Sequence, residues 1–466
     1  MTAVSIAFQS NPGRYNFEGT TQLVNAYAEQ RGNDAKGPLS VLPCDGVVEF
    51  ADIAVSGPCR GLHFMEDLDK LYGFTPSSVT KYESDASGVR IGTIPGNDIV
   101  QTSRNQKTDP QLVVRHNAGV QVIESDSAAF ITDVDLPDDV ISAAYASGYH
   151  AYLEENRKFT LSSLEDAGTI NALDFATAEQ RAGKAVRAVE NAGELVIFCS
   201  TWSEFWRNVT DPDFPFAPIA FRPVGLMAPH AVVNCDNTLM FPGNDGIVYA
   251  FNNYDPVRIS NHHVERLIQE DDNQSSILGF GWSRGGHAFA SLTGTDWTRC
   301  YDANTKLWHS RQSYGRNDWR VRWAVPAWGK IIVGDALSGK LGYLDSNTYT
   351  EFGDPIIWKV VSPPMHTFPN GGIVDAFHMD LATGYGTLSG QGSNPKVMLR
   401  VSKDGGNTFG QYRELELGVT GKYATRVTAR RLGAFGPKGI VFEISISDPV
   451  VRALVSTDVE IRPLKR

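Results

Sequence analysis

The chain has 466 residues, more than one ordinary hydrophobic core needs, so the length suggests about two to four domains, and one large all-β unit with a smaller domain would also fit. Its 44 glycines and 24 prolines favour many turns over long helices. The formal net charge of −11 excludes the basic surface of a sequence-reading nucleic-acid binder. It is compatible with DNA passing nearby, because a negative surface repels phosphate.

The cysteines and the N-terminus indicate a reducing compartment. The five cysteines are scattered, odd in number and without a C-x-x-C pair, which predicts buried free thiols and neither a disulfide framework nor a zinc site. The first residues show no signal-peptide pattern, and no apolar run has the length that spans a bilayer. We expect the protein to fold in the cytoplasm.

Residues 1–57 are predicted to form an N-terminal arm. Turn residues at 11–13 and 32–34 lie on either side of one apolar segment, 23–28. We expect one or two strands there, ordered by packing on the following propeller.

From residue 58 onward a pattern recurs: a short apolar strand, a turn of small or polar residues, and a second strand. Its seven copies begin at spacings of 41, 38, 45, 44, 49 and 43 residues, namely at Lys70, Gln111, Tyr149, Glu194, Thr238, His287 and Lys330. This period is typical of four-stranded propeller blades, which stack radially and protect one another's edges. We therefore predict an all-β fold with a β-propeller of about seven blades, six or seven, over residues 58–365. The count depends on whether the last blade borrows an N-terminal strand. Only residues 178–189 and 264–269 are compatible with short amphipathic helices.

After the proline pair at 363–364 the spacing of the strands changes. Alternating stretches follow at 396–401, 413–417, 424–431, 439–445 and 450–461, and short strands at this spacing predict a β-sandwich-like domain over residues 371–466. Residues 462–466 are expected to be a frayed end.

One short motif in this region is specific. Ser402, Asp404, Gly406, Thr408 and Phe409 fit S-x-D-x-G-x-T-[FW], which resembles the Asp box of sialidase-like propellers. We predict a structural turn, in which the aspartate accepts hydrogen bonds, the glycine takes a positive φ and the aromatic ring packs beneath. The box lies away from the catalytic centre in sialidases, so it does not predict hydrolysis.

The sequence offers no reaction centre. A glycosidase needs two carboxylates a few ångströms apart in a cleft, and the candidates Glu154, Glu155, Asp245 and Asp335 fall in turns or at strand ends, where acidic residues are usually solvated. No phosphate-binding loop, nucleophile elbow or dinucleotide fingerprint occurs. We predict no catalytic residue and no cofactor.

Two segments could suggest a metal, and neither fits one well. His262 and His263 are adjacent and therefore point apart, with no third ligand at a useful spacing. The acidic segment 132–139 lacks the glycine and terminal glutamate of an EF-hand and is better explained as a loop between blades. We predict no metal site.

A series of segments, in order, resembles a known family. They are 23–29 (LVNAYAE), 175–179 (FATAE), 194–198 (ELVIF), 204–206 (EFW), 212–216 (PDFPF), 228–229 (AP), 236–239 (DNTL), 246–249 (GIVY), 256–260 (PVRIS), 286–289 (GHAF), 307–309 (LWH) and 398–406 (MLRVSKDGG), with Arg413, Gly418, Gly421, Tyr423, Arg426 and 431–433 (RLG). The chain is similar here to the packaged-DNA stabilisation proteins of short-tailed phages, also called tail accessory factors or tail hub proteins. The similarity is continuous over 175–310 and clear again over 395–450, whereas residues 30–110 match poorly.

The resemblance implies a structural virion protein of the tail, assembled in the host cytoplasm and without enzymatic activity. In that family six copies form a ring below the portal and its adaptor. The ring continues the DNA channel, helps retain the packaged genome and anchors a tail needle or plug and tailspikes or fibres. DNA would pass through the lumen without sequence-specific binding. The alternative is a sialidase-like or lectin-like propeller acting on surface glycans; a scaffold propeller that binds peptides in a cell is a third possibility.

Overall fold

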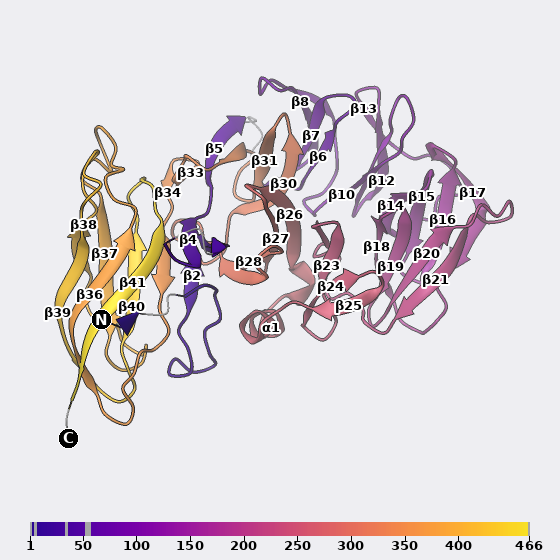
Figure 1. Cartoon of the computed structure of the whole chain (residues 1–466). Helices are drawn as coiled ribbons and strands as arrows, with labels where there is room; N and C mark the ends of the chain where they lie inside the picture. The colour runs from indigo at the N-terminus through magenta and orange to yellow at the C-terminus, as the bar shows by residue number, and fades with distance from the viewer. Residues whose placement is uncertain (1, 4–6, 33–35, 52–56, 465–466) are drawn as a thin grey trace.

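The computed structural model describes residues 2–3, 7–32, 36–51 and 57–464 and contains two β-rich bodies side by side (Figure 1). The larger, drawn from purple to salmon, is a propeller, and the smaller, in orange and yellow, is a sandwich. The all-β class predicted from the sequence is confirmed. The turn predicted at 32–34 and the chain end predicted at 462–466 lie partly outside the described residues.

The first four blades are four-stranded antiparallel sheets, each made from consecutive strands. They comprise β6 (Gly61–Met65), β7 (Lys70–Thr75), β8 (Ser78–Tyr82) and β9 (Gly88–Gly92); β10 (Gln101–Arg104), β11 (Leu112–His116), β12 (Gly119–Glu124) and β13 (Ser127–Phe130); β14 (Val140–Ala146), β15 (Tyr149–Glu154), β16 (Lys158–Ser163) and β17 (Asp166–Thr177); and β18 (Ala185–Asn191), β19 (Glu194–Cys199), β20 (Ser203–Asn208) and β21 (Phe216–Arg222).

Three more sheets complete a propeller of seven blades. They comprise β22 (Val233–Cys235), β23 (Thr238–Pro242), β24 (Val248–Asn252) and β25 (Asp255–Arg258); β26 (Leu278–Arg284), β27 (His287–Thr293), β28 (Thr298–Asp302) and β29 (Leu307–Ser310); and β30 (Val321–Ala327), β31 (Lys330–Asp335) and β32 (Leu341–Asp345) with β5 (Gly46–Ala51). The seventh blade therefore does borrow its outer strand from the N-terminal segment. Two short strands, β33 (Thr350–Glu351) and β34 (Asp354–Pro355), extend this sheet beyond β5.

The repeat found in the sequence is the hairpin of the second and third strands of each blade. Its copies begin at or beside the first residues of β7, β11, β15, β19, β23, β27 and β31. In the fourth blade, for example, Leu195 of β19 pairs with Trp206 of β20. Both residues are buried in the core between the third and fourth blades. The period is visible in the sequence because the first strand of this hairpin is a nearly continuous buried run in every blade.

The C-terminal body packs two sheets face to face. One sheet runs β3 (Ala26–Gln30), β4 (Leu39–Pro43), β41 (Leu454–Pro463), β36 (Gly372–Leu381) and β39 (Val427–Phe435), with β1 (Thr2–Ala3) on β41; the other runs β2 (Gln22–Val24), β35 (Trp358–Val361), β40 (Val441–Ile446), β37 (Lys396–Ser402) and β38 (Arg413–Glu416). Their inner faces form one apolar core. Phe377 and Phe442 stack in it with ring centroids 4.1 Å apart.

The N-terminal segment belongs to both bodies. Strand β2 pairs with β29 of the sixth blade on one side and with β35 of the sandwich on the other, so one continuous sheet crosses from propeller to sandwich. Asn25, at a positive φ of 53°, turns the chain between β2 and β3. Its amide donates to the carbonyls of Gln312 and Ile357, both at 2.9 Å. The segment expected to pack on the propeller thus also supplies strands to the sandwich.

One helix of the two expected forms. Helix α1 (His262–Gln269) is capped by Asn261, whose side chain accepts from the amide of Val264. The prediction of a helix over 178–189 is wrong: the chain there enters β18, the first strand of the fourth blade. The alanines gave this stretch a helical pattern, but sheet pairing with β19 decides its conformation.

Among the described residues no helix is long and apolar enough to cross a membrane. All five cysteines are buried and unpaired, as predicted.

Candidate functional site: the joint between propeller and sandwich

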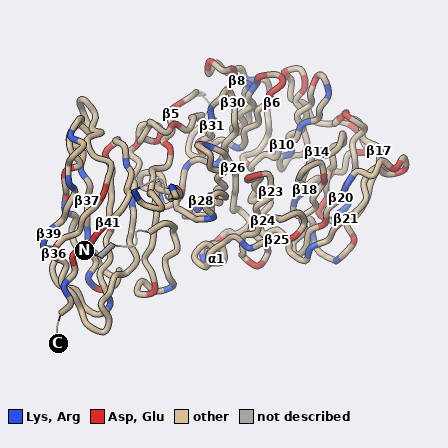
Figure 2. Tube along the Cα trace, viewed as in Figure 1, with Lys and Arg blue, Asp and Glu red and all other residues tan. Residues whose placement is uncertain are grey.

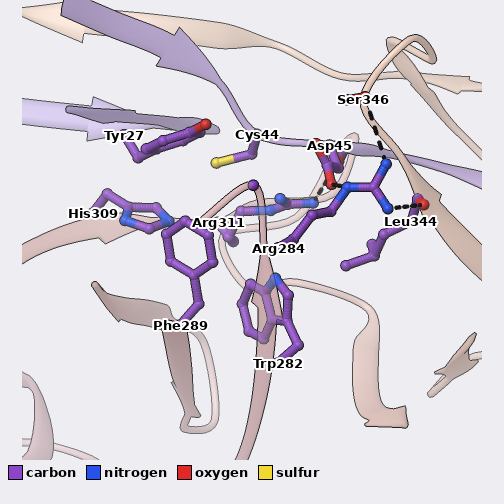
Figure 3. Close-up of a pocket in the computed structure, with 11 residues that line it drawn as sticks. Tyr27, Cys44, Asp45, Trp282, Arg284, Phe289, His309, Arg311, Leu344 and Ser346 are labelled. Carbon is purple, nitrogen blue, oxygen red and sulfur yellow. Dashed lines mark hydrogen bonds and ion pairs between the residues drawn. The ribbon is translucent and has the colours of Figure 1, made fainter. Parts of the chain in front are cut away.

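A cavity of about 330 Å³ lies where the N-terminal segment crosses the sixth and seventh blades (Figure 3). We call this region the joint. Its walls come from β3, the turn between β4 and β5, β26, β27, the end of β29 and the end of β32, through Tyr27, Cys44, Asp45, Trp282, Arg284, Gly285, Phe289, His309, Arg311, Leu344 and Ser346. Residues far apart in the sequence are therefore brought together here by three segments of chain.

Two arginines hold the turn at Asp45. Arg284 forms an ion pair with the Asp45 carboxylate at 2.5 Å and donates to the carbonyl of Leu344 at 3.0 Å. Arg311, which is only 3% exposed, donates to the carbonyl of Asp45 at 3.1 Å. Its guanidinium lies 4.0 Å from the ring centroid of Trp319. These two arginines of the sixth blade therefore hold Asp45 in place, and Asp45 directly precedes β5, the outer strand of the seventh blade.

The reactive groups of the joint are held in their neutral forms. Burial raises the pKa of the Cys44 thiol to about 11, against the lowering effect of Arg311. Burial, assisted by the charges of Arg311 and Arg299, lowers the pKa of His309 to about 3. A protonated thiol is not a nucleophile. The joint has the chemistry of a packed structural contact.

A second contact of the N-terminal segment lies at the motif 402–409. Asp404 accepts from the Ser402 hydroxyl at 2.6 Å, and from the amide and hydroxyl of Thr408 at 2.9 and 2.6 Å. These hydrogen bonds hold the pKa of Asp404 well below its usual range. Gly406 has a φ of +98°, and a Cβ there would lie 2.4 Å from the Thr20 side chain. The Phe409 ring packs under the Arg400 guanidinium, whose central carbon lies 4.8 Å from the ring centroid.

Two family models match the chain, and together they cover both bodies. The model described as bacteriophage P22 Gp10, beta-propeller, matches residues 20–349, and the model described as bacteriophage P22 Gp10, beta-sandwich, matches residues 357–462. The chain belongs to the bacteriophage P22 Gp10 family. The resemblance to packaged-DNA stabilisation proteins seen in the sequence is confirmed, and the chain is a structural protein of a phage tail.

Comparison with solved structures adds no argument about function. A computationally designed protein, Ika8, is 9% identical with a TM-score of 0.42, and the match covers 64% of this chain and 99% of that chain. The extracellular domain of the one component system BT4673 from B. thetaiotaomicron is 10% identical with a TM-score of 0.43, over 64% of this chain and 40% of that chain. No curated protein matches the chain.

In this Gp10-family chain the four candidate carboxylates lie on three different blades. Glu154 ends β15 and Glu155 begins the turn after it, Asp245 lies in the turn after β23, and Asp335 ends β31. Asp335 is fully buried and accepts from Arg320 Nε at 2.8 Å and Nη2 at 2.6 Å. The hydroxyl of Tyr249 donates to Asp245 at 2.7 Å. The structure does not bring these carboxylates together as a glycosidase pair.

The two adjacent histidines point to different partners. His262 lies 3.5 Å from Glu265 of the same helix, whereas His263 lies 3.0 Å from Nη2 of Arg299 in the sixth blade. The Glu265 carboxylate already forms an ion pair with Arg258, at 2.6 Å. Among the residues that the structure describes, no group of three or more His, Cys, Asp or Glu could hold a metal ion.

The acidic segment 132–139 lies between the second and third blades. Asp133 accepts from the amide of Asp135 at 2.9 Å and from the amide of Ile170 in β17 at 3.0 Å. Its oxygens therefore stabilise the long outer strand β17, as a loop between blades would.

Sequence reasoning missed the joint itself. Arg284 and Arg311 are single arginines at strand ends, and their neighbouring residues do not distinguish them from arginines that are exposed to solvent. The one available signal was the apolar segment 23–28, which is interrupted by Asn25. A polar residue inside such a segment indicates a turn, and it could have divided the arm into the two strands β2 and β3.

Proposed function

We propose that the chain is a subunit of a ring in the head-to-tail connector of a short-tailed phage. The ring is a homohexamer below the portal and its adaptor, continues the DNA channel, helps retain the packaged genome and anchors the tail needle or plug and the tailspikes or fibres. The observation that carries this proposal is the match of both bodies, in order, to the propeller and the sandwich of Gp10. Nothing in this role requires a cofactor or enzymatic activity.

The way the two bodies are joined supports a role in bearing load. Strand β2 is hydrogen-bonded to both bodies, and β5 closes the seventh blade after β4 has paired within the sandwich. Moving one body against the other would break backbone hydrogen bonds as well as side-chain contacts. A connector that holds pressurised DNA needs such rigid subunits.

The charge distribution supports passage of DNA without sequence reading. Figure 2 shows acidic and basic residues interspersed over both bodies. The excess of acidic residues gives each subunit a charge of −11, so six copies around a channel would repel phosphate wherever acidic faces line the lumen.

The deciding experiment is electron microscopy of the purified chain with portal–adaptor complexes, and of the chain alone. We expect rings on the adaptor, with or without rings in the free protein, because connector subunits can remain monomeric until they dock. Absence of any density below the adaptor at saturating concentration would contradict the proposal. Turnover of sialosides or capsular glycans by the monomer would instead support the glycan-acting alternative.

A further inference from the structure

The two bodies of the chain differ in charge. Residues 371–466, which form most of the sandwich, hold 13 Lys and Arg against 9 Asp and Glu, a net charge of +4. The rest of the chain holds the other 29 Lys and Arg against the other 44 Asp and Glu, a net charge of −15. Each copy of the chain therefore presents a weakly basic body and a strongly acidic body to its neighbours.

Basic side chains gather at the open edge of the sandwich. Arg430 and Arg431 lie in β39, the last strand of one sheet, and Arg413 lies in β38, the last strand of the other. Arg413 Nη1 donates to the carbonyl of Arg430 at 3.1 Å, so the two edge strands meet here. The Lys403 ammonium also lies against β39, because a Cβ built on Gly433 would be 2.7 Å from its Nζ. We call Lys403, Arg413, Arg430 and Arg431 the basic edge.

The basic edge is directed outward and lacks acidic partners. A bulge opposite β36 places Arg431 at a positive φ of 59°, which breaks the alternation of the strand and leaves both Arg430 and Arg431 exposed. Glu414, beside Arg413 in β38, pairs with Lys396 instead, at 2.5 Å. In the part of the chain that the structure describes, none of the four exposed side chains of the basic edge forms an ion pair.

Acidic side chains gather at the outer end of the third blade. Residues 171–174 of β17 bulge away from β16, and loop 132–139 packs beside them. The amide of Ala172 donates to the Asp135 carboxylate at 3.4 Å. We call Asp135, Asp138, Asp139 and Asp174 the acidic edge. None of these four carboxylates forms an ion pair with another described residue.

The acidic edge also carries exposed apolar side chains. Val134 in the loop is 94% exposed, and Leu173 in the bulge is 80% exposed. The neighbouring base, Lys158, lies 4.6 Å from the Phe175 ring centroid and is already paired with Glu154 at 3.6 Å. Apolar side chains surrounded by unpaired charges of one sign are typical of a surface that contacts another protein.

The two edges lie at opposite ends of the molecule, β39 at one end and β17 at the other (Figure 1). We propose that the basic edge of one copy docks on the acidic edge of the next copy, head to tail. Two different patches that match each other make a heterologous contact, which closes into a ring when the rotation between copies permits it. Their opposite charges also steer the copies into register. The inference rests on the proposed connector ring and names the contact between its subunits.

The test is charge reversal in the full chain, with ring formation on portal–adaptor complexes measured by electron microscopy. Arg430→Glu with Arg431→Glu places like charges across the contact and should weaken ring formation at least about tenfold. Asp138→Lys with Asp139→Lys should do the same from the other side. A chain that carries all four reversals again has opposite charges across the contact and should recover its rings. Added salt should weaken the wild-type ring, because the charges are exposed.

Arg90→Glu with Lys306→Glu is the matched control, since both residues are exposed on the first and sixth blades, away from either edge. This variant changes the net charge as Arg430→Glu with Arg431→Glu does and should form rings like the wild type. Melting temperatures verify that each variant folds. Rings that persist in both edge reversals, loss of rings in the control, or no recovery in the folded fourfold variant would overturn the contact and leave the connector role intact. Absence of rings in the wild type would overturn both.

Discussion

The fourth and seventh blades of the propeller each contain a four-stranded sheet, but they obtain those strands in different ways. In the fourth blade, β18 to β21 follow one another in the chain, and Trp202, Phe205 and Trp206 fill apolar contacts with the neighbouring blades. The seventh blade has only three consecutive strands and takes its fourth, β5, from residues almost three hundred positions earlier.

Both blades pack on apolar cores, which in the seventh include the fully buried Trp319. The seventh blade differs in that arginines also hold its connecting segments, through carbonyl groups and a few carboxylates. Apolar packing is specified by local patterns, but a distant strand needs directional contacts that fix where it lies. This difference can be tested by substitutions in each region.

The largest effect is expected in the fourth blade. Trp202 is completely buried, and its indole donates to the carbonyl of Ala182 at 3.1 Å. Trp202→Ala should lower the free energy of unfolding by about 3–5 kcal/mol, because it leaves a large cavity. Denaturant unfolding of the propeller measures this. The control Leu173→Ala, at an 80% exposed position, should change it by less than about 0.5 kcal/mol; equal effects would contradict the role of local apolar packing.

The next effect concerns the connection between the bodies. The guanidinium of Arg452, 1% exposed, donates to the carbonyls of Ile356 at 2.8 Å and Asp448 at 2.7 Å. Residues 350–356 link the two family matches, so this arginine ties that link to the sandwich. Arg452→Met should cost about 3 kcal/mol, since buried carbonyls lose charged donors.

Calorimetry distinguishes this effect from general destabilisation. We expect the propeller and sandwich of Arg452→Met to unfold at more widely separated temperatures, with faster proteolysis at 350–356. The exposed control Arg430→Met should leave the unfolding profile unchanged. A single transition shifted as a whole would show that Arg452 does not couple the two bodies.

A buried acid makes the fourth blade sensitive to pH. Glu204 of β20 is 1% exposed, and burial raises the pKa of its carboxyl to about 7. The stability that the Glu204 carboxyl contributes is fully present below its ordinary pKa of 4.5 and is lost as the pH rises through 7. The reason is that this carboxyl ionises at a lower pH in the unfolded chain than in the folded one. Glu204→Gln should therefore be more stable than wild type at pH 8, by on the order of 2 kcal/mol, and differ little at pH 4. A constant difference between pH 4 and pH 8 would exclude this titration.

The smallest effect is expected at the turn 402–409, which contacts the N-terminal segment. Asp404→Ala removes the acceptor of three hydrogen bonds from Ser402 and Thr408 and should cost about 1–2 kcal/mol. The pKa of Asp404 is lowered in the folded state, so its contribution is present above the ordinary value of 3.8 and is lost as the pH falls toward the folded pKa. Unfolding between pH 2 and 6 should show wild type and variant converging at low pH. A gap that stays constant to pH 2 would mean that the carboxylate charge is unimportant there.

Local sequence patterns were sufficient to predict the parts of the molecule whose residues are close together in the chain. The spacing of the hairpins predicted a propeller of six or seven blades, and alternation after residue 371 predicted five of the sandwich strands, because burial of one face imposes a local period on each strand. Helix α1 followed from the pattern at 264–269, whereas residues 178–189 showed that the same kind of pattern yields to sheet pairing.

The position of the N-terminal segment depends on contacts between residues that are distant in the sequence. Nothing in residues 22–51 indicates that β2 joins two bodies, that β3 and β4 enter the sandwich, or that β5 completes the seventh blade. The partners of these strands lie hundreds of residues away, and an edge strand accepts any suitable neighbour through its backbone groups. The joint at Asp45 has the same origin: it gathers polar residues from separate segments of the chain, and no local pattern indicates that they meet.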